Sequence, residues 1–138
     1  MSTRIPTVLG VLAALLCLLA LATKGCTSPR RQAIEALDRV GSDALRKDAA
    51  LLYKNLFAST APDYSAVKST EWRPSFRSLE PKQVGAYRDG FALALMIDGD
   101  TESGLYVIPA GMDVKPRATN RNRFEQVRDG IYWYTFAR

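Results

Sequence analysis

The apolar positions along the chain follow three successive patterns, and each pattern predicts a different kind of structure. Residues 8–22 are apolar and carry no charged side chain, which is typical of a membrane helix or of the apolar part of a signal peptide. From residue 29 to 59 apolar side chains recur at intervals of three and four, which predicts amphipathic helix. From residue 82 onward the apolar runs are short and separated by turn residues, which predicts strands.

The first apolar run has a length that fits either a signal peptide or a membrane span. A retained helix would anchor the rest of the chain, and cleavage after Ala22 would release it. Cleavage before Cys26 followed by lipidation of that cysteine is the third possibility, although Lys24 is unusual at such a site. We therefore interpret residues 1–25 as a signal or membrane anchor, with retention favoured and the other two fates left open.

The charges around this run disagree about its orientation. More Lys and Arg side chains follow the run than precede it, which favours a cytoplasmic location for the remainder. The order of a basic start, an apolar middle and a small-residue end is instead typical of an export signal. We favour export, so the expected location is the extracytoplasmic face of a membrane.

Residues 29–59 are predicted to be helical. Ser28 can cap the helix and Pro29 suits its first position. Gly41 interrupts the apolar stripe, and Ser42 can cap a second helical segment. The region is therefore either two short helices or one helix weakened at the glycine.

Turn residues divide the C-terminal part into strands. Arg-Asp-Gly occurs twice, at 88–90 and at 128–130, each time between apolar runs. Asp-Gly in this position predicts a hairpin, because the tight turn needs residues that accept a positive φ. Residues 60–81 are predicted to be a connector that wraps over the core, because they carry many large apolar groups. The predicted strands are 83–87, 91–97, 104–108, 124–127 and 131–136.

These elements together predict an α+β fold. It consists of an N-terminal hydrophobic membrane helix, then helical segments packed on a small antiparallel meander sheet of about five strands. Residues 26–59 are the helical segment and residues 60–138 the small β-rich domain. Both are expected to belong to one globular unit, because a chain of 138 residues less its anchor has room for one modest core.

The composition excludes several kinds of active site. The chain has no histidine, so it cannot form a His-based acid–base relay or a zinc site of the usual His/Cys types. Its two cysteines are Cys17 and Cys26, so the part beyond them has no internal disulfide and no thiolate metal site. No phosphate-binding or dinucleotide motif occurs, and no cofactor or metal is expected.

Two short patterns have the spacing of known catalytic or metal-binding motifs. Ser65 and Lys68 match the Ser-x-x-Lys spacing of penicillin-binding enzymes, in which one helical turn brings the amine to the hydroxyl. Asp98, Asp100 and Glu102 alternate like the start of a calcium loop, but the sixth and twelfth positions are wrong. We interpret the first as a chance match and the second as a solvated turn.

A basic loop followed by an aromatic strand is the candidate interaction surface. The net charge of +5 suits contact with anionic lipid or polymer, and we expect an exposed aromatic patch on residues 131–136. Basic and aromatic side chains together can bind single-stranded nucleic acid, but no motif of that class is present, which disfavours it. The candidate residues are Lys115, Arg117, Arg121, Arg123, Tyr132, Trp133 and Tyr134.

The sequence favours a membrane-anchored, non-catalytic envelope or interaction protein. Its expected partners are membrane lipid and either a protein or an anionic envelope polymer. One alternative is a small exported hydrolase that uses carboxylate or Ser/Lys chemistry. The other is a cytoplasm-facing module that binds an anionic polymer or nucleic acid.

Overall fold

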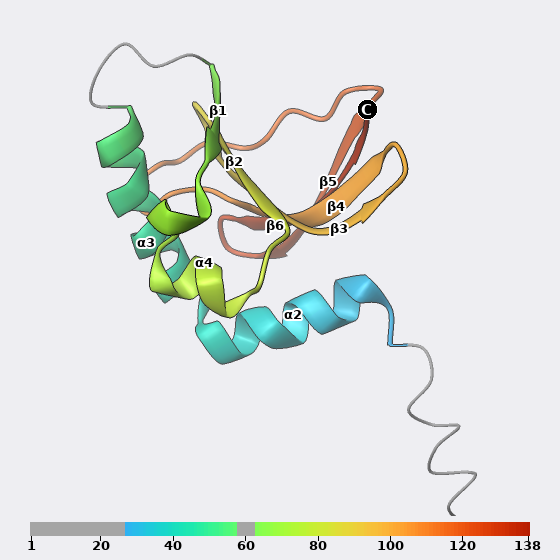
Figure 1. Cartoon of the computed structure of the whole chain (residues 1–138), viewed down its shortest axis with the longest axis horizontal. Coiled ribbons are helices and arrows are strands. Elements are labelled where there is room, and N and C mark those ends of the chain that lie inside the picture. The colour runs from blue at the N-terminus through green and yellow to red at the C-terminus, as the bar shows by residue number, and fades with distance from the viewer. Residues whose placement is uncertain (1–26, 58–62) are drawn as a thin grey trace, which may run out of the picture.

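The computed structural model describes residues 27–57 and 63–138 and confirms the α+β class. The described helices gather on one side of the sheet (Figure 1). They are α2 (Pro29–Val40), α3 (Ser42–Leu56), α4 (Pro74–Ser78) and the short 3-10 turn η1 (Ser69–Glu71). The strands are β1 (Tyr64–Val67), β2 (Gln83–Tyr87), β3 (Gly90–Asp98), β4 (Thr101–Val107), β5 (Asn122–Arg128) and β6 (Ile131–Ala137).

The predicted membrane helix and both cysteines lie outside the described residues. Among the helices that the structure does describe, none has the length and apolar character needed to cross a bilayer.

The sheet differs from the predicted five-strand meander in two respects. Its order is β1-β2-β3-β4-β6-β5, with every neighbouring pair antiparallel. β1 is a sixth strand, inside the segment predicted to be a connector, and it pairs with β2. β6 pairs with both β4 and β5, because the long connection at residues 108–121 carries the chain to the sheet edge before the last turn returns it.

Both Arg-Asp-Gly sequences form hairpins, as predicted, but their glycines serve different purposes. Gly130 lies in the turn with a φ of +65°. Gly90 is instead the first residue of β3, paired with Tyr87, and its predicted positive-φ role is wrong. A Cβ on Gly90 would lie 2.6 Å from the carbonyl oxygen of Val107, so this glycine allows two strands to approach closely.

The N-terminal helical segment is two helices separated at Gly41. The Ser28 hydroxyl accepts a hydrogen bond from the Arg31 backbone at 3.3 Å, and Pro29 is the first helical residue, as predicted. Gly41 has a φ of +91°, a conformation that glycine adopts without steric cost. Gly41 also occupies the position before α3 that Ser42 was expected to fill.

The helices and the sheet share one hydrophobic core. Leu37 of α2, Leu45 of α3 and Phe76 of α4 are fully buried and belong to the same cluster as Phe91 and Leu93 of β3. Successive residues of a strand point to opposite faces, so the intervening positions form a second cluster on the face away from the helices. That cluster consists of Ala92, Tyr106, Ile108, Tyr132 and Tyr134.

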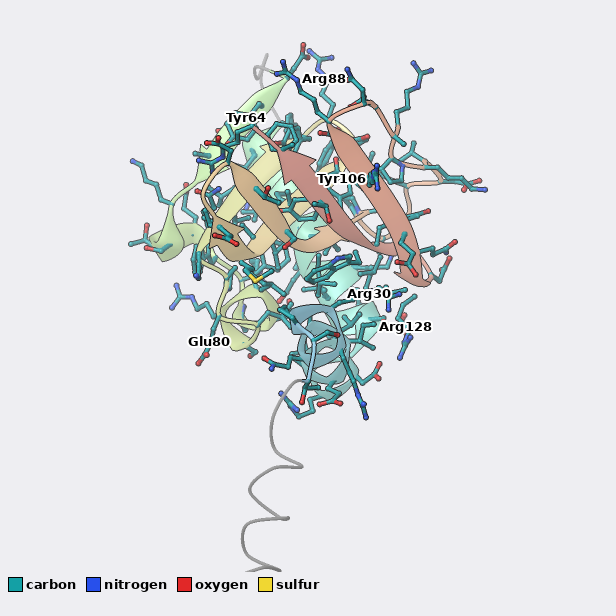
Figure 2. The ribbon with its side chains drawn as sticks, turned by 90° about the vertical axis from the view of Figure 1, so that its right-hand side faces the viewer. Arg30, Tyr64, Glu80, Arg88, Tyr106 and Arg128 are labelled. Carbon is teal, nitrogen blue, oxygen red and sulfur yellow. The ribbon has the colours of Figure 1, made fainter. Side chains whose placement is uncertain are left out.

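Ionic contacts join the helix layer to the sheet. Arg30 and Arg128 (Figure 2) connect α2 and β5 through Glu125 and Asp38, at 2.6 and 2.8 Å. These pairs are exposed, and pairs of this kind contribute little to stability. They nevertheless orient α2 along the edge strand.

Arg46 of α3 makes a more buried connection to the ends of two strands. Its Nε donates to the carbonyl oxygen of Ile108 at 3.0 Å, and its Nη1 donates to Asp129 at 2.9 Å. The Arg46 carbonyl accepts from the Ala110 backbone at 3.0 Å. Arg46 therefore holds the end of β4 and the β5–β6 turn against the helix.

Gly130→Val is expected to destabilise the protein by roughly 2–3 kcal/mol, from backbone strain of about 1–2 kcal/mol and weakened hydrogen bonds. A Cβ on Gly130 would lie 2.5 Å from the Arg46 guanidinium. Urea unfolding measures the loss. In an Arg46→Ala background the same substitution should cost less, and an equal cost in both backgrounds would contradict the proposed contact.

Candidate functional site

Aromatic side chains form a continuous row across the sheet face that the helices leave uncovered. Tyr64 and Tyr87 lie opposite each other on β1 and β2, with ring centroids 5.0 Å apart. Tyr106 lies 6.1 Å from Tyr87, 5.2 Å from Phe124 and 6.3 Å from Tyr134. We call these five residues the aromatic row; Tyr64 and Tyr106 are labelled in Figure 2.

The members of the aromatic row other than Tyr64 line a cavity of about 250 Å³, which we call the tyrosine pocket. Strands form its floor, and Pro116 and Arg117 from the connection between β4 and β5 form part of its wall. Its other polar side chains are Asp89, Glu102 and Asn122. Rings with a few converging polar groups are the usual make-up of a small-molecule site.

Glu102 is a buried carboxylate whose two oxygens are both occupied by protein donors. Its Oε1 accepts from the Tyr134 hydroxyl at 2.5 Å. Its Oε2 accepts from Gln83 at 2.6 Å and from Arg138 at 3.0 Å. These donors offset the cost of burying the charge, so Glu102 positions Tyr134 and the end of the chain.

Two acceptor atoms in the tyrosine pocket are left without a donor. Asp89 uses one carboxylate oxygen to accept the Tyr106 hydroxyl, and its other oxygen has no hydrogen-bond partner within the described ranges. The side-chain oxygen of Asn122 is buried and also lacks a partner there. Buried polar atoms are nearly always satisfied in proteins, so the Asn122 oxygen is unusual, whereas Asp89 is only partly buried and its second oxygen is accessible to a molecule that donates hydrogen bonds.

The tyrosines of the pocket are held in their neutral form. Burial raises the pKa of Tyr87 to about 12, with smaller contributions from Tyr64 and from the negative charges of Glu102 and Asp89. Burial and the hydrogen bond to Asp89 raise the pKa of Tyr106. The pKa of Tyr134 is raised by burial and by its bond to Glu102. The pocket therefore disfavours additional negative charge.

These shifts predict that stability falls as the pH rises above 10. A tyrosine whose folded pKa is raised contributes stability that is complete below its unfolded pKa of about 10 and is lost as the pH rises from there toward the folded value. Tyr134→Phe should cost about 1–3 kcal/mol at pH 7, because Glu102 loses one of its three donors. Urea unfolding from pH 7 to 11 should show this difference from the wild type shrinking above pH 10, and a constant difference would contradict the assignment.

The seven residues predicted as an interaction surface do not gather on one surface. Arg117 and Tyr134 line the tyrosine pocket, and Tyr132 belongs to the same face. Trp133 packs against the helix-side core. Arg123 on β5 pairs with Thr135 on β6 and faces the same way. The other two are exposed in the connection between β4 and β5: Lys115 and Arg121. Their role as an interaction surface stays a prediction.

The exposed aromatic patch expected on residues 131–136 is not found. Tyr132 and Tyr134 are buried, and Trp133 and Phe136 are half-buried. The exposed rings of this face lie instead on the first two strands, where Tyr64 is 51% exposed.

Sequence reasoning missed most of the pocket. Glu102 was interpreted as part of a solvated turn, but β4 begins at Thr101 and buries it. The available signal was the alternation of Glu102, Gly104 and Tyr106, which places all three on one face of a strand. The pairing that brings Tyr87 and Asp89 beside them could not be deduced from spacing.

The Ser65 and Lys68 match does not form a catalytic pair. Ser65 lies in β1, where the chain is extended and residues three apart are separated by roughly 10 Å. The helical turn that would bring the amine to the hydroxyl is therefore absent at this place.

A second groove, of about 610 Å³, lies between α3 and residues 109–112. Its walls are mostly apolar, and its charged side chains are Lys47 and Lys54. It lacks the converging polar groups that would orient a ligand, so the tyrosine pocket is the stronger candidate.

Comparison with protein-family models, curated proteins and solved structures finds no match to this chain.

Proposed function

We propose that this protein is a non-catalytic binding domain, held at the extracytoplasmic face of a membrane, that takes a ligand into the tyrosine pocket. The observation that carries the proposal is the pocket itself, with aromatic walls and two acceptors that lack donors. A pocket of this make-up on the sheet face opposite the helices is suited to recognition.

The apolar run at residues 8–22 supports the membrane location. A retained helix, or acyl chains on Cys26 after cleavage, would each hold the domain beside the bilayer. Membrane lipid is then the first partner, and a protein or an anionic envelope polymer is a further one.

The state of Glu102 favours binding over catalysis. Both oxygens of Glu102 accept hydrogen bonds from protein donors, which leaves that group in a positioning role. The alternative of an exported hydrolase also receives no support from Ser65 and Lys68, which lie on an extended segment. The nucleic-acid alternative is disfavoured because Arg117 and Arg123 lie on opposite faces.

Topology reporters test the location. Two fusions after Arg138 are compared, one active only outside the cytoplasm and one active only inside it. We expect activity from the first fusion in the full chain, and loss of that activity when residues 1–25 are deleted. Activity of the cytoplasm-only fusion in the full chain would contradict the proposal.

A further inference from the structure

We propose that the tyrosine pocket recognises a primary ammonium group carried on a short apolar body. This inference rests on the proposed binding function and specifies its ligand class. It is drawn from the unsatisfied acceptors, the aromatic walls and the sign of the charges around them.

The acceptors that lack protein donors favour a ligand that donates hydrogen bonds. The free oxygen of Asp89 and the buried oxygen of Asn122 both belong to residues that line the pocket. Two hydroxyl donors of the pocket are already used, because Tyr106 donates to Asp89 and Tyr134 donates to Glu102. An ammonium group supplies up to three N–H donors and no acceptor, which complements this site.

The walls favour a cation over a neutral donor. The faces of Tyr87, Tyr106 and Phe124 carry a negative quadrupole that attracts a cation within about 6 Å of the ring. Close packing of the same rings would also desolvate an apolar body attached to the charge.

The charges around the pocket have the same preference. Arg138 is paired with Glu102 at 3.0 Å, which neutralises that carboxylate. Among the described residues Asp89 has no such cationic partner, and Arg117 at the wall is exposed to water, where its field is screened. A cationic ligand would therefore be matched by Asp89, although the chain as a whole has a net charge of +5.

The size of the pocket limits the ligand. A volume of about 250 Å³ is below the roughly 300–1,000 Å³ of sites for drug-sized molecules. We therefore expect a small amine, or the amine end of a larger molecule, and we expect a quaternary ammonium to fit poorly because it has no N–H to donate.

The experiment uses the full chain, labelled with ε-¹³C tyrosine, in phosphatidylcholine nanodiscs. Titration with butylammonium is compared with titrations of butanol and of butyltrimethylammonium. Both match its apolar body, but butanol lacks its charge and butyltrimethylammonium lacks its N–H donors. We expect saturable shifts of the Tyr87, Tyr106 and Tyr134 resonances with butylammonium. Tyr53, whose hydroxyl donates to the Arg88 carbonyl from α3, is the internal control and should not shift.

Two variants test the acceptors. Asp89→Asn keeps an acceptor for Tyr106 and should weaken butylammonium binding about tenfold or more, as expected for loss of a charged hydrogen bond. Asp113→Asn removes the same charge from an exposed position outside the pocket and should change affinity less than about twofold. Asn122→Ala should weaken binding without loss of thermal stability, because it removes a buried atom that has no partner.

Several outcomes would overturn the inference. Binding of butanol or of butyltrimethylammonium as tight as that of butylammonium would do so, and so would an unchanged affinity for butylammonium in Asp89→Asn. A further such outcome is that N-acetylglucosamine shifts the tyrosine resonances and butylammonium does not. The last outcome would leave the binding function standing and replace its ligand class. Failure of the topology reporters, by contrast, would contradict the proposed function without bearing on the amine.

The lipid composition of the nanodiscs distinguishes between two sources of the amine, a lipid headgroup and a free amine. Phosphatidylethanolamine presents a primary ammonium in its headgroup, whereas phosphatidylcholine presents a quaternary one. Tyrosine shifts in ethanolamine-containing nanodiscs before any butylammonium is added would identify a lipid headgroup as the source. Shifts that require the soluble amine would identify a free amine, and both results support the shared chemistry.

Discussion

Gly104→Ala is expected to destabilise the protein by about 3 kcal/mol or more, at the upper end of the range for overpacked sites. Gly104 lies on β4 opposite Ala94 of β3. A Cβ there would lie 1.9 Å from the carbonyl oxygen of Leu93 and 2.9 Å from the backbone nitrogen of Leu95. Backbone atoms in the centre of a sheet cannot move aside, so the methyl group would force the two strands apart.

The neighbouring residue provides the control. Ser103 is buried on β4 next to Gly104, and Ser103→Ala makes a change of similar size without adding an atom to the strand contact. Urea unfolding should give a loss for Ser103→Ala that is smaller by about 2 kcal/mol. Equal stability of the two variants would contradict the close approach of β3 and β4.

Phe91→Ala is expected to cost roughly 3–5 kcal/mol, the range for removing a buried phenylalanine. Phe91 is fully buried on β3. Its ring meets that of Phe76 edge to face, with centroids 5.6 Å apart, so the substitution also leaves a cavity between α4 and the sheet.

Leu51→Ala is the matched control for this loss. Leu51 is 48% exposed on α3, and its substitution should cost less than about 1 kcal/mol. In the double variant Phe76→Ala with Phe91→Ala, the coupling between the rings should be about 0.5–1.5 kcal/mol. A Phe91→Ala loss as small as that of Leu51→Ala would contradict the placement of the core.

The helices and hairpins could be predicted because their signals are local. Ser28, Pro29 and Gly41 mark helix ends by hydrogen bonding and by backbone conformation. Gly130 marks a turn for the same kind of reason. Such signals involve residues a few positions apart, so no knowledge of the packing is needed to interpret them.

The sheet order could not be predicted because it depends on contacts distant in sequence. β1 is short, and its burial alternates incompletely, so Tyr64–Val67 is indistinguishable from a connector until β2 is beside it. The placement of β5 outside β6 depends on the long connection at residues 108–121, which carries no periodic signal. A meander is the simplest expectation for consecutive strands. It holds from β1 to β4 and fails for β5 and β6, whose order in the sheet is reversed.

Two acidic residues show how packing can change the meaning of a local pattern. Asp48 interrupts the apolar stripe of α3, and in the structure its carboxylate accepts the Ser75 hydroxyl at 2.7 Å and the Ser75 backbone at 3.1 Å. Burial opposes its ionisation, but these bonds and Arg73 hold the pKa of Asp48 below its usual value. Glu102 likewise belongs to a polar run in the sequence and is buried by its neighbours.

The candidate site was harder to predict than the fold because five strands, β2 to β6, contribute to it. Tyr87, Tyr106 and Tyr134 are ordinary strand residues when considered singly, since tyrosine is common in sheets. They form a pocket because the strand register brings their rings together and because the acceptors of Asp89 and Asn122 lie beside them. Periodicity indicates which face a residue occupies, and pairing decides which residues share that face.

Cell fractionation followed by intact-mass measurement tests most directly whether the domain is held at a bilayer. The account predicts that the chain sediments with membranes, resists extraction by high salt and dissolves in detergent. The mass then distinguishes a full-length anchor from a form lipidated at Cys26. Recovery of the complete Met1–Arg138 polypeptide as a monomer in detergent-free buffer would contradict the account.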